Sequence, residues 1–494
     1  MVRRRLAYSL LSLAVVTSCS CVSPGEGPFP ASDAMYFPVG LAVSPGGHTL
    51  YVANSDFDLQ YNSGTVIALD LDRVRSNVPR VWEANAPCGS LGQNTMKLLY
   101  PGPCGPISLH HPPDGQGSLV AASVRIGAFA TDMIAVKRPD APASRLFLPV
   151  RGDPSITWID VEDDTDLEPP FHRVLHCGGE RCDARHRAGE NPNTNLRRTV
   201  LPPEPYGIAV SESRDVVVVT HQTTGSVSLV SNAWDGIPTL EFVSGGFPIG
   251  GVGVAALPVP RYVTVSQSDY QPGFLATFRA SPEIDLIRYF DDRAAAPARP
   301  FLVRAGVAPI RVNASGYDSR GIAIDPTDRR ACEAECQDDL ACLQACASVP
   351  VQVYVANRTP PSLLVGETRS NVSPTASDDL VTVFDTIPLT YGASRVLLGS
   401  VVNTAGQSER RVFVSCFDAR FIFIYDPVTR RIDGQIRTGR GPHAMVLDPH
   451  EPLLYVAHFT DSYIGVVDLD QRHATTYPSI IATLGIPLPP RESK

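Results

Sequence analysis

The chain has little positive charge and no long apolar run after its first residues. Its 494 residues include 42 Lys and Arg against 51 Asp and Glu, a net charge of −9. The one basic run is Arg3–Arg5, at the start. Nucleic-acid binding needs a concentrated positive surface, so the sequence argues against a nucleic-acid partner. The apolar run Leu6–Val16 is too short to cross a bilayer as a helix, and no later run is long enough.

The sequence also lacks the short motifs that mark several classes of enzyme. It has no CxxCH for covalent haem, no GxSxG nucleophile motif, no HExxH zinc motif and no Gly-rich phosphate loop. Arg151-Gly152-Asp153 spells an adhesion tripeptide, but the repeat pattern of the chain places it in a plain turn. We therefore assign no catalytic residue, cofactor or metal from sequence motifs.

What the sequence has in abundance is a repeated β pattern. The stretch Pro442–Leu469 indicates three short strands, because apolar residues alternate along each strand and Gly, Pro, Asp or Ser separate them. Related units recur at 38–71, 129–161, 205–232, 249–280, 320–385 and 411–427. Such repetition of small antiparallel units is typical of a β-propeller. Seven copies predict an all-β, seven-bladed β-propeller, with six or eight blades as alternatives.

The copies can be aligned on the residue that ends the second strand. The shortest gap between such residues is 42 positions, close to a bare blade of roughly 40–45, and the longest is 96. The longer gaps predict insertions at 72–116, 162–196, 281–318, 330–349 and 358–378. All belong to one domain spanning 37–487, followed by a tail at 488–494. The aligned residues are Asn54, Val150, His221, Val265, Asn357, Cys416 and His458.

Several of these units also resemble a known family. GLAVSPGGHTLYVAN at 40–54, GIAIDP with VYVAN near 321–357, and PHAMVLDP with LYVAH near 442–458 are similar to the YVTN-type β-propeller repeat. The resemblance covers most of residues 37–485. It implies the propeller fold and says little about activity, because members of this family range from binding proteins to enzymes.

The N-terminus predicts an exported lipoprotein. Residues 1–18 have the positive start and short apolar segment of a secretory signal. Val16-Thr17-Ser18-Cys19 resembles a bacterial lipobox, in which Cys19 is acylated; an ordinary signal peptide is the alternative. Residues 19–36 then form a flexible, lipidated tether. We expect a protein of the cell envelope, facing the periplasm or the exterior, with Ser20 favouring the outer membrane over the inner.

The 11 cysteines of an exported chain favour disulfides. The spacing predicts Cys88–Cys104 and Cys177–Cys182. Within 332–346, cysteines four residues apart share a helix face, so two short helices folded back would form Cys332–Cys346 and Cys336–Cys342. A four-thiolate zinc site is the alternative for this group. Cys21 is left without a role, and Cys416 is expected to be a small buried side chain.

Polar residues at strand ends form the candidate binding site. We expect Asn54, His221, Asn357, His443 and His458 to lie near the central channel, on the side where the tether enters. A histidine cluster there could hold a metal, but the histidines occupy positions where other repeats have Asn, which favours a structural role and no metal. Asp residues end the predicted third strands and read as turn residues: Asp70, Asp160, Asp385, Asp426 and Asp468.

These observations favour a non-catalytic propeller, anchored to a membrane by its lipid, that binds or organises a protein or glycan partner. The alternative is a propeller enzyme, a lactone hydrolase or a quinoprotein-like oxidoreductase, with a metal in the channel. The Cys-bearing insertions are expected on the face opposite the tether, which makes that face the predicted binding surface. The alternative is that these insertions only cap the propeller. Residues 358–378, expected as a link on the tether side, are a competing binding loop.

Overall fold

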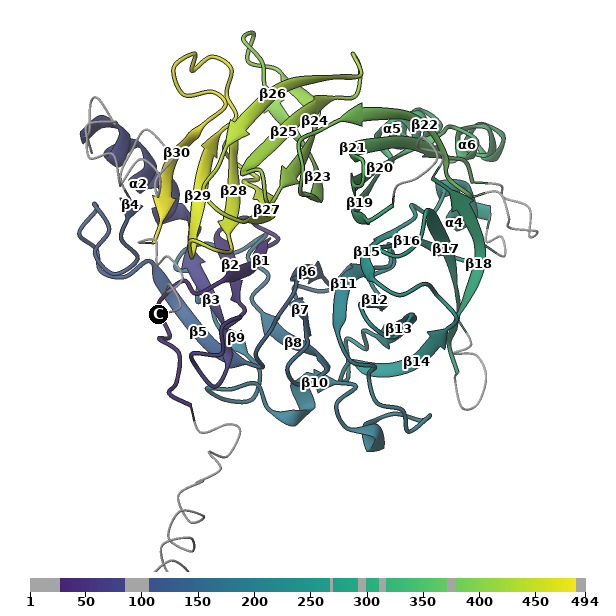
Figure 1. The fold of residues 1–494 in the computed structure, drawn as a ribbon, viewed down its shortest axis with the longest axis horizontal. Coiled ribbons are helices and arrows are strands. Elements are labelled where there is room, and N and C mark those ends of the chain that lie inside the picture. Colours follow the sequence, from purple (N-terminus) through teal and green to yellow (C-terminus); the bar gives the residue numbers. More distant parts are fainter. Residues whose placement is uncertain are drawn as a thin grey trace, which may run out of the picture.

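The chain folds into a ring of seven antiparallel sheets around a central axis (Figure 1). The computed structural model describes residues 27–84, 106–266, 270–291, 299–310, 317–370 and 379–485. The fold is therefore a seven-bladed β-propeller, as the repeats predict, and the alternatives of six and eight blades are wrong. None of the helices in these ranges is long and apolar enough to cross a membrane.

Each blade is built from strands that follow one another in the chain, ordered from the axis outward. Blades 1 to 3 consist of β1 Pro38–Val43, β2 Thr49–Asn54, β3 Gly64–Asp70 and β5 Val120–Ile126; β6 Ile134–Lys137, β7 Ser144–Val150 and β8 Ser155–Val161 with β9 Leu175–His176 and β10 Arg187–Ala188; and β11 Pro205–Val210, β12 Val216–His221, β13 Ser226–Ser231 and β14 Thr239–Gly245.

Blades 4 to 7 repeat this arrangement. They consist of β15 Gly251–Ala256, β16 Gly273–Phe278, β17 Glu283–Phe290 and β18 Phe301–Pro309; β19 Ser319–Asp325, β20 Val351–Arg358, β21 Pro361–Thr368 and β22 Thr382–Pro388; β23 Ala393–Val402, β24 Ser408–Cys416, β25 Phe421–Asp426 and β26 Arg431–Arg437; and β27 Pro442–Leu447, β28 Leu453–His458, β29 Tyr463–Asp468 and β30 Ile480–Leu484. The short β4 Pro106–Ile107 pairs in parallel with β30.

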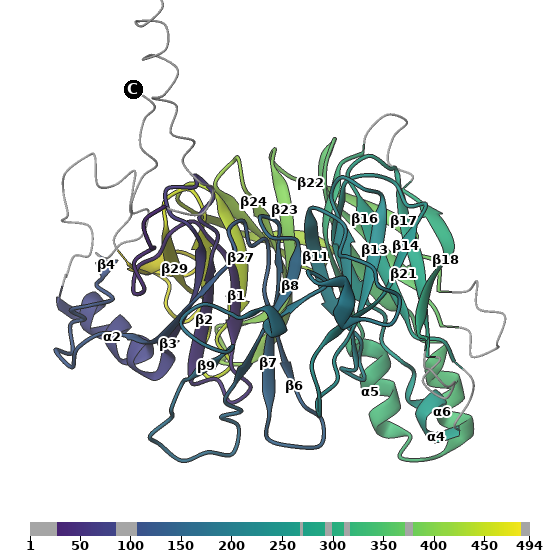
Figure 2. The ribbon, with the colours of Figure 1, turned by 90° about the horizontal axis from the view of Figure 1, so that it is seen from below.

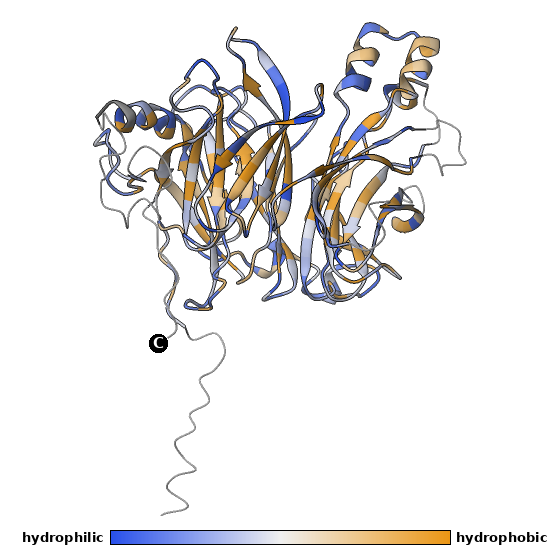
Figure 3. Ribbon diagram, turned by 45° about the horizontal axis from the view of Figure 1, so that its top comes forward, coloured by the Kyte–Doolittle hydropathy of each residue, from blue (hydrophilic) through white to orange (hydrophobic). Residues whose placement is uncertain are grey.

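Alternation along the buried strands joins the blades. In β2, Leu50 and Val52 belong to the core shared with blade 7, whereas Tyr51 and Ala53 belong to the core shared with blade 2. Successive side chains of a strand point to opposite faces, so one strand can supply two cores. Figure 3 shows the consequence, with hydrophobic residues running through the middle of the blades.

The two faces of the ring differ. One face, which we call the tether-side face, has the turns between second and third strands and the links between blades; Pro28 lies there, its carbonyl bonded to the N–H of Asn62 in the β2–β3 turn. The other, the insertion face, has the helices α4 Arg261–Ser266, α5 Thr327–Glu335 and α6 Leu340–Ala347, which project from it in Figure 2, and α2 Leu71–Ala84 follows β3 at that end.

Blade 7 is joined to blade 1 by side chains as well as by the pairing of β30 with β4. On the insertion face, Arg75 of α2 donates to both carboxylate oxygens of Asp448 at 2.8 and 2.9 Å and to Asp72 at 2.9 Å. His450 contacts the Gly46 carbonyl at 2.8 Å. The side chain of Asp448 is fully buried, so its charge depends on Arg75 for a partner. This ion pair therefore holds blade 7 against blade 1.

The predicted register is wrong in blades 4 and 5. Val265 does not end a strand but lies in α4, and the second strand of blade 4 is β16, ending at Phe278. The range 281–318 is no insertion, because it contains β17 and β18. The range 358–378 contains β21, so the turn after β20 is short, and Asp385 lies in the fourth strand, β22.

The physical reason in blade 4 is tertiary contact. The segment at 261–266 alternates like a strand, but the Arg261 N–H donates to Glu333 Oε1 at 2.8 Å and its guanidinium pairs with Asp338 at 2.7 Å. These contacts cap a helical turn against the hairpin of α5 and α6, and such context overrides the strand preference of Val and Thr.

Two further expectations need correction. The range 162–196 does not stay on the insertion face but runs along the outer edge of blade 2 as β9 and β10. The Cys182 N–H donates to the Arg125 carbonyl near the tether-side end of β5. The disulfide Cys177–Cys182 is therefore not on the face of α5 and α6. Residues 27–36, predicted as tether, pack on blade 1, where Met35 is buried. The predicted signal, Cys19 and the Cys88–Cys104 pair lie outside the described residues.

Candidate functional site

The strand-end residues chosen from the sequence do not converge on one site. His221 is fully buried, with its two ring nitrogens 3.1 Å from the Pro203 carbonyl and 2.8 Å from Ser228 Oγ. His458 stacks on Tyr463 at 4.1 Å, and Asn54 donates to Thr65 at 2.9 Å. Asn357 likewise bonds to neighbouring backbone carbonyls. These side chains point into their own blades, and only His443 reaches the channel.

A cavity of about 190 Å³ opens at the mouth of the central channel, on the tether-side face. Its lining comes from the second residue of several first strands and from residues just after several second strands, so nearly every blade contributes. The lining residues are Val39, Ser55, Phe57, Phe129, Ala130, Thr131, Arg151, Tyr206, Arg320, Arg358, Ser394, Phe417, His443 and Phe459.

One side of the mouth is a chain of charged and amide groups. Arg151 forms an ion pair with Glu204. The Gln222 amide, with its nitrogen toward Glu204 at 3.1 Å, presents its oxygen to Arg279 at 3.2 Å. The Arg151 Nε is buried and has no hydrogen-bond partner among the described residues. One donor of this polar side is thus unused by the protein.

The polar side continues through Arg320 and Arg358 with their acidic partners. Arg279 and Arg320 share Asp318, at 3.2 and 2.6 Å, and Arg358 pairs with Asp418 at 3.3 Å. The pKa of Arg320 lies below its ordinary value because burial disfavours its charge and because Arg358 and Arg279 repel it, although Asp318 opposes the shift. A bound anion would relieve this repulsion.

The opposite side of the mouth is aromatic. The ring of Phe57 lies 5.8 Å from Phe129 and 5.1 Å from Phe459, and Phe459 lies 6.1 Å from Phe417. These separations and tilted arrangements are typical of favourable aromatic contacts. The cavity therefore has a polar side, contributed largely by blades 2 to 6, and an aromatic side contributed by blades 6, 7, 1 and 2.

His443 supplies a neutral acceptor between the two sides. Its Nδ1 lies 2.9 Å from the Val39 carbonyl, which can only accept, so Nδ1 holds the proton and Nε2 is the unprotonated nitrogen. Burial and then the nearby charge of Arg395 lower the pKa of His443 to about 3. Arg395 itself crosses the channel to Asp132 at 2.5 Å and to the Thr131 carbonyl at 3.1 Å.

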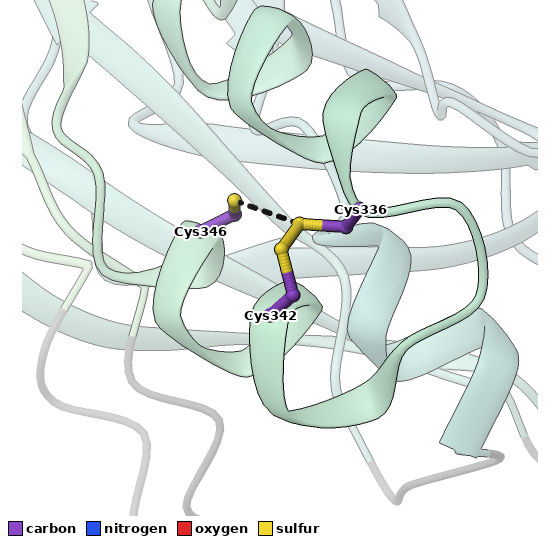
Figure 4. A group of neighbouring side chains, drawn as sticks. All are labelled: Cys336, Cys342 and Cys346. Atoms are coloured by element: carbon purple, nitrogen blue, oxygen red, sulfur yellow. Dashed lines mark hydrogen bonds between the residues drawn. A yellow bond between two sulfur atoms is a disulfide. The ribbon is translucent and has the colours of Figure 1, made fainter.

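The hairpin cysteines form disulfides rather than a set of thiolates. Cys332–Cys346, Cys336–Cys342 and Cys177–Cys182 are closed, which are the pairs that the spacing predicts. Cys336, Cys342 and Cys346 have their sulfur atoms within 4.8 Å of one another (Figure 4), but sulfur in a disulfide is not the thiolate that zinc requires. Cys416 is buried and free, as expected.

Comparisons with known proteins add little beyond the fold. No family model and no curated protein matches the chain. Among solved structures, it is similar to a protein of Bacteroides fragilis provisionally named a 6-phosphogluconolactonase, at 12% identity, a TM-score of 0.48, and coverage of 90% of this chain and 98% of that one. A periplasmic gluconolactonase of Pseudomonas aeruginosa matches at 13% identity and a TM-score of 0.44, covering 72% and 85%.

A third similar structure is the hydrazine synthase of Kuenenia stuttgartiensis, at 11% identity, a TM-score of 0.45, and coverage of 90% of this chain and 98% of that one. Two of these names denote a lactonase and the third a hydrazine synthase. At such identities and TM-scores the likenesses support no conclusion about what this chain binds or converts.

Sequence reasoning missed most of the cavity by one position. It selected one residue at or beside the end of most second strands, whereas the cavity is lined by the residue that follows: Ser55 after Asn54, Arg358 after Asn357 and Phe459 after His458. Since side chains alternate, a shift of one residue changes the direction from the blade to the channel. The signal was present in the aligned repeats.

Proposed function

We propose that this protein is a binding propeller whose channel mouth holds a small organic anion, and that Cys19 anchors it to a membrane of the cell envelope. The single observation that supports binding is the two-sided cavity on the tether-side face. Its arginines suit a carboxylate, phosphate or sulfate, and its phenylalanines suit an adjacent apolar or ring-shaped part. The acidic end of a glycan has this chemistry, so the proposed ligand can be part of a glycan. We also propose that the chain belongs to the YVTN-type propeller family.

Binding is favoured over hydrolysis by the low basicity of His443, which lines the cavity. A general base acts best when its pKa is near the working pH. The pKa of His443 is about 3, because of burial and Arg395, so His443 is a weak base at neutral pH. Among the described residues that line the cavity, none is Asp or Glu. A neutral imidazole nitrogen is suited instead to accept a hydrogen bond from a ligand hydroxyl.

Binding can be tested by calorimetry with phenyl phosphate, benzoate and glucuronate as probes. We expect at least one probe to bind, and Arg320→Gln to weaken it about tenfold or more, because a charge-assisted hydrogen bond contributes roughly 1.5–3 kcal/mol. Arg410→Gln is the matched control, since Arg410 pairs with Asp328 on the insertion face at 3.1 Å. Equal binding by both variants, or no binding of any probe by the wild type, would contradict the proposal.

The anchor is tested separately, by fractionating cells that express Cys19→Ala. We expect the variant to leave the membrane fraction, because the acyl chains on Cys19 supply the membrane affinity. A variant that stays with membranes as the wild type does would show that the attachment lies elsewhere. This result would not affect the cavity, whose residues are distant in sequence from Cys19.

A further inference from the structure

The turn between β2 and β3 borders two cavities. Ser55 and Phe57 line the channel cavity, but Asp56 lies between them and is fully buried, with an exposed fraction of 0%. It lines another, smaller cavity, between the turn and the segment at 30–36 that crosses blade 1. The same turn therefore separates the channel mouth from an internal space that contains a carboxylate.

The Asp56 carboxylate is only half satisfied. Its Oδ1 accepts the Tyr61 N–H at 3.1 Å, whereas its Oδ2 is buried and has no partner among the described residues. Burial raises the pKa of Asp56 to about 7. A buried carboxylate without a counter-charge is costly, so such groups are normally paired or coordinate a metal.

The space in front of Asp56 fits one ion and is rich in oxygen. Its volume is about 30 Å³, enough for a single water-sized occupant. None of the described residues lining it is Lys, Arg or His, so no side chain there supplies positive charge. The lining residues with side-chain oxygens are Tyr36, Asn54, Asp56, Tyr61, Ser63 and Thr65.

We infer that this cavity is a binding site for a hard, oxygen-seeking cation of the calcium, magnesium or sodium class, with Asp56 as its anionic ligand. Neutral oxygens and water complete the coordination of such ions in proteins. Asn54 and Tyr36 are already joined by a hydrogen bond of 3.1 Å across the cavity wall, so the cation would hold the segment at 30–36 to the β2–β3 turn. The inference does not depend on the proposed function of the channel mouth.

The test is thermal unfolding of the full mature protein after chelation and dialysis, with CaCl2, MgCl2 or NaCl restored at matched ionic strength. At ten times its dissociation constant, the bound cation should raise the folding equilibrium constant about tenfold, seen as a rise in the unfolding temperature. The three salts distinguish which cation fits. Elemental analysis of protein purified without chelator should find about one equivalent if the cation is divalent and tight.

Asp56→Asn keeps the shape and removes the charge, so it should abolish the response to the cation. Asp58→Asn is the control, because Asp58 lies two residues on and already pairs with the Tyr36 hydroxyl at 2.5 Å. A wild type whose unfolding temperature does not respond to any of the three salts would overturn the inference, whether or not Asp56→Asn folds. So would an Asp56→Asn variant that responds as the wild type does.

Discussion

The two faces of this propeller use arginine in opposite ways. On the insertion face, Arg75 places its donors on Asp448, Asp72 and the Gly47 carbonyl, and the Asp448 side chain is fully buried. On the tether-side face, Arg151 has a buried Nε without a partner among the described residues, and Arg320 shares one carboxylate with Arg279. The first arrangement is complete within the protein, and the second leaves a donor without a protein partner.

The difference shows where this fold keeps stability and where it keeps binding capacity. Buried groups that are fully paired hold blades 7 and 1 together, and removing one partner leaves the other charge buried and uncompensated. Partly paired groups at a cavity cost stability but are available to a ligand. Substitutions on each face test this difference.

The largest effect is expected at the closure of the ring. Arg75→Ala should lower the free energy of unfolding by about 3 kcal/mol, because it leaves Asp448 buried without its cation. The effect would be measured as a shift of the urea unfolding midpoint. Binding at the channel mouth should be unchanged below the new midpoint, since the cavity is on the other face.

Arg138→Ala is the matched control for this substitution. Arg138 also makes two ion pairs, with Asp140 and Asp235, but both carboxylates are largely exposed, at 70% and 88%. Exposed pairs contribute little, so the shift of the urea midpoint should be far smaller than that of Arg75→Ala. If both variants lost the same stability, burial of Asp448 would not be what makes the Arg75 pair important.

A smaller effect is expected near the tether-side face, as acid sensitivity. Burial lowers the pKa of His458 to about 3, against 6.5 for an ordinary histidine. Between these values the unfolded chain binds the proton and the native protein does not, so stability is lost as the pH falls below 6.5. At pH 5.5 the loss from His458 is about 1.4 kcal/mol relative to pH 7.5 or above.

His458→Asn should remove that part of the pH dependence. Asn stands at the same repeat position in Asn54 and Asn357, and it does not titrate. The quantity to compare is the difference in unfolding free energy between pH 7.5 and 5.5 within each variant, so that any loss of packing cancels. The exposed His176→Asn should behave as the wild type. An unchanged difference in His458→Asn would show that His458 is not a source of the acid sensitivity.

Six of the seven aligned repeat positions were read correctly from the sequence, because their second strands are buried on both sides and bounded by turn residues. The alternating side chains of VYVAN and LYVAH indicate a strand clearly. Blade 4 failed because RYVTVS has the strand pattern while its helical state depends on Glu333 and Asp338, far along the chain. In blade 5 the third strand was mispredicted, because only a short turn separates β20 from β21 and the segment was predicted as a loop.

The candidate site was less predictable than the fold. Of the strand-end residues chosen from the sequence, His443 lines the cavity, and a register shifted by one residue would have added Arg358 and Phe459. The pairing of Arg279 with Asp318, and of Arg395 with Asp132 across the channel, joins residues of different blades or links. No local pattern indicates such pairs, since they exist only once the ring is closed. Asp56 could not be chosen from the sequence either, because its burial depends on how the segment at 30–36 packs on the β2–β3 turn.

The consecutive order of strands within each blade has a consequence for how the molecule forms. Most strand pairings join neighbouring strands of one blade, which allows blades to form one after another, N-terminal blades first, during synthesis. One of the contacts that complete the ring, Arg75 with Asp448, spans 373 residues. A chain whose blade 7 has not yet formed is therefore an open arc. Leu50 and Val52, on the side of blade 1 that blade 7 later covers, stay exposed until the last blade forms.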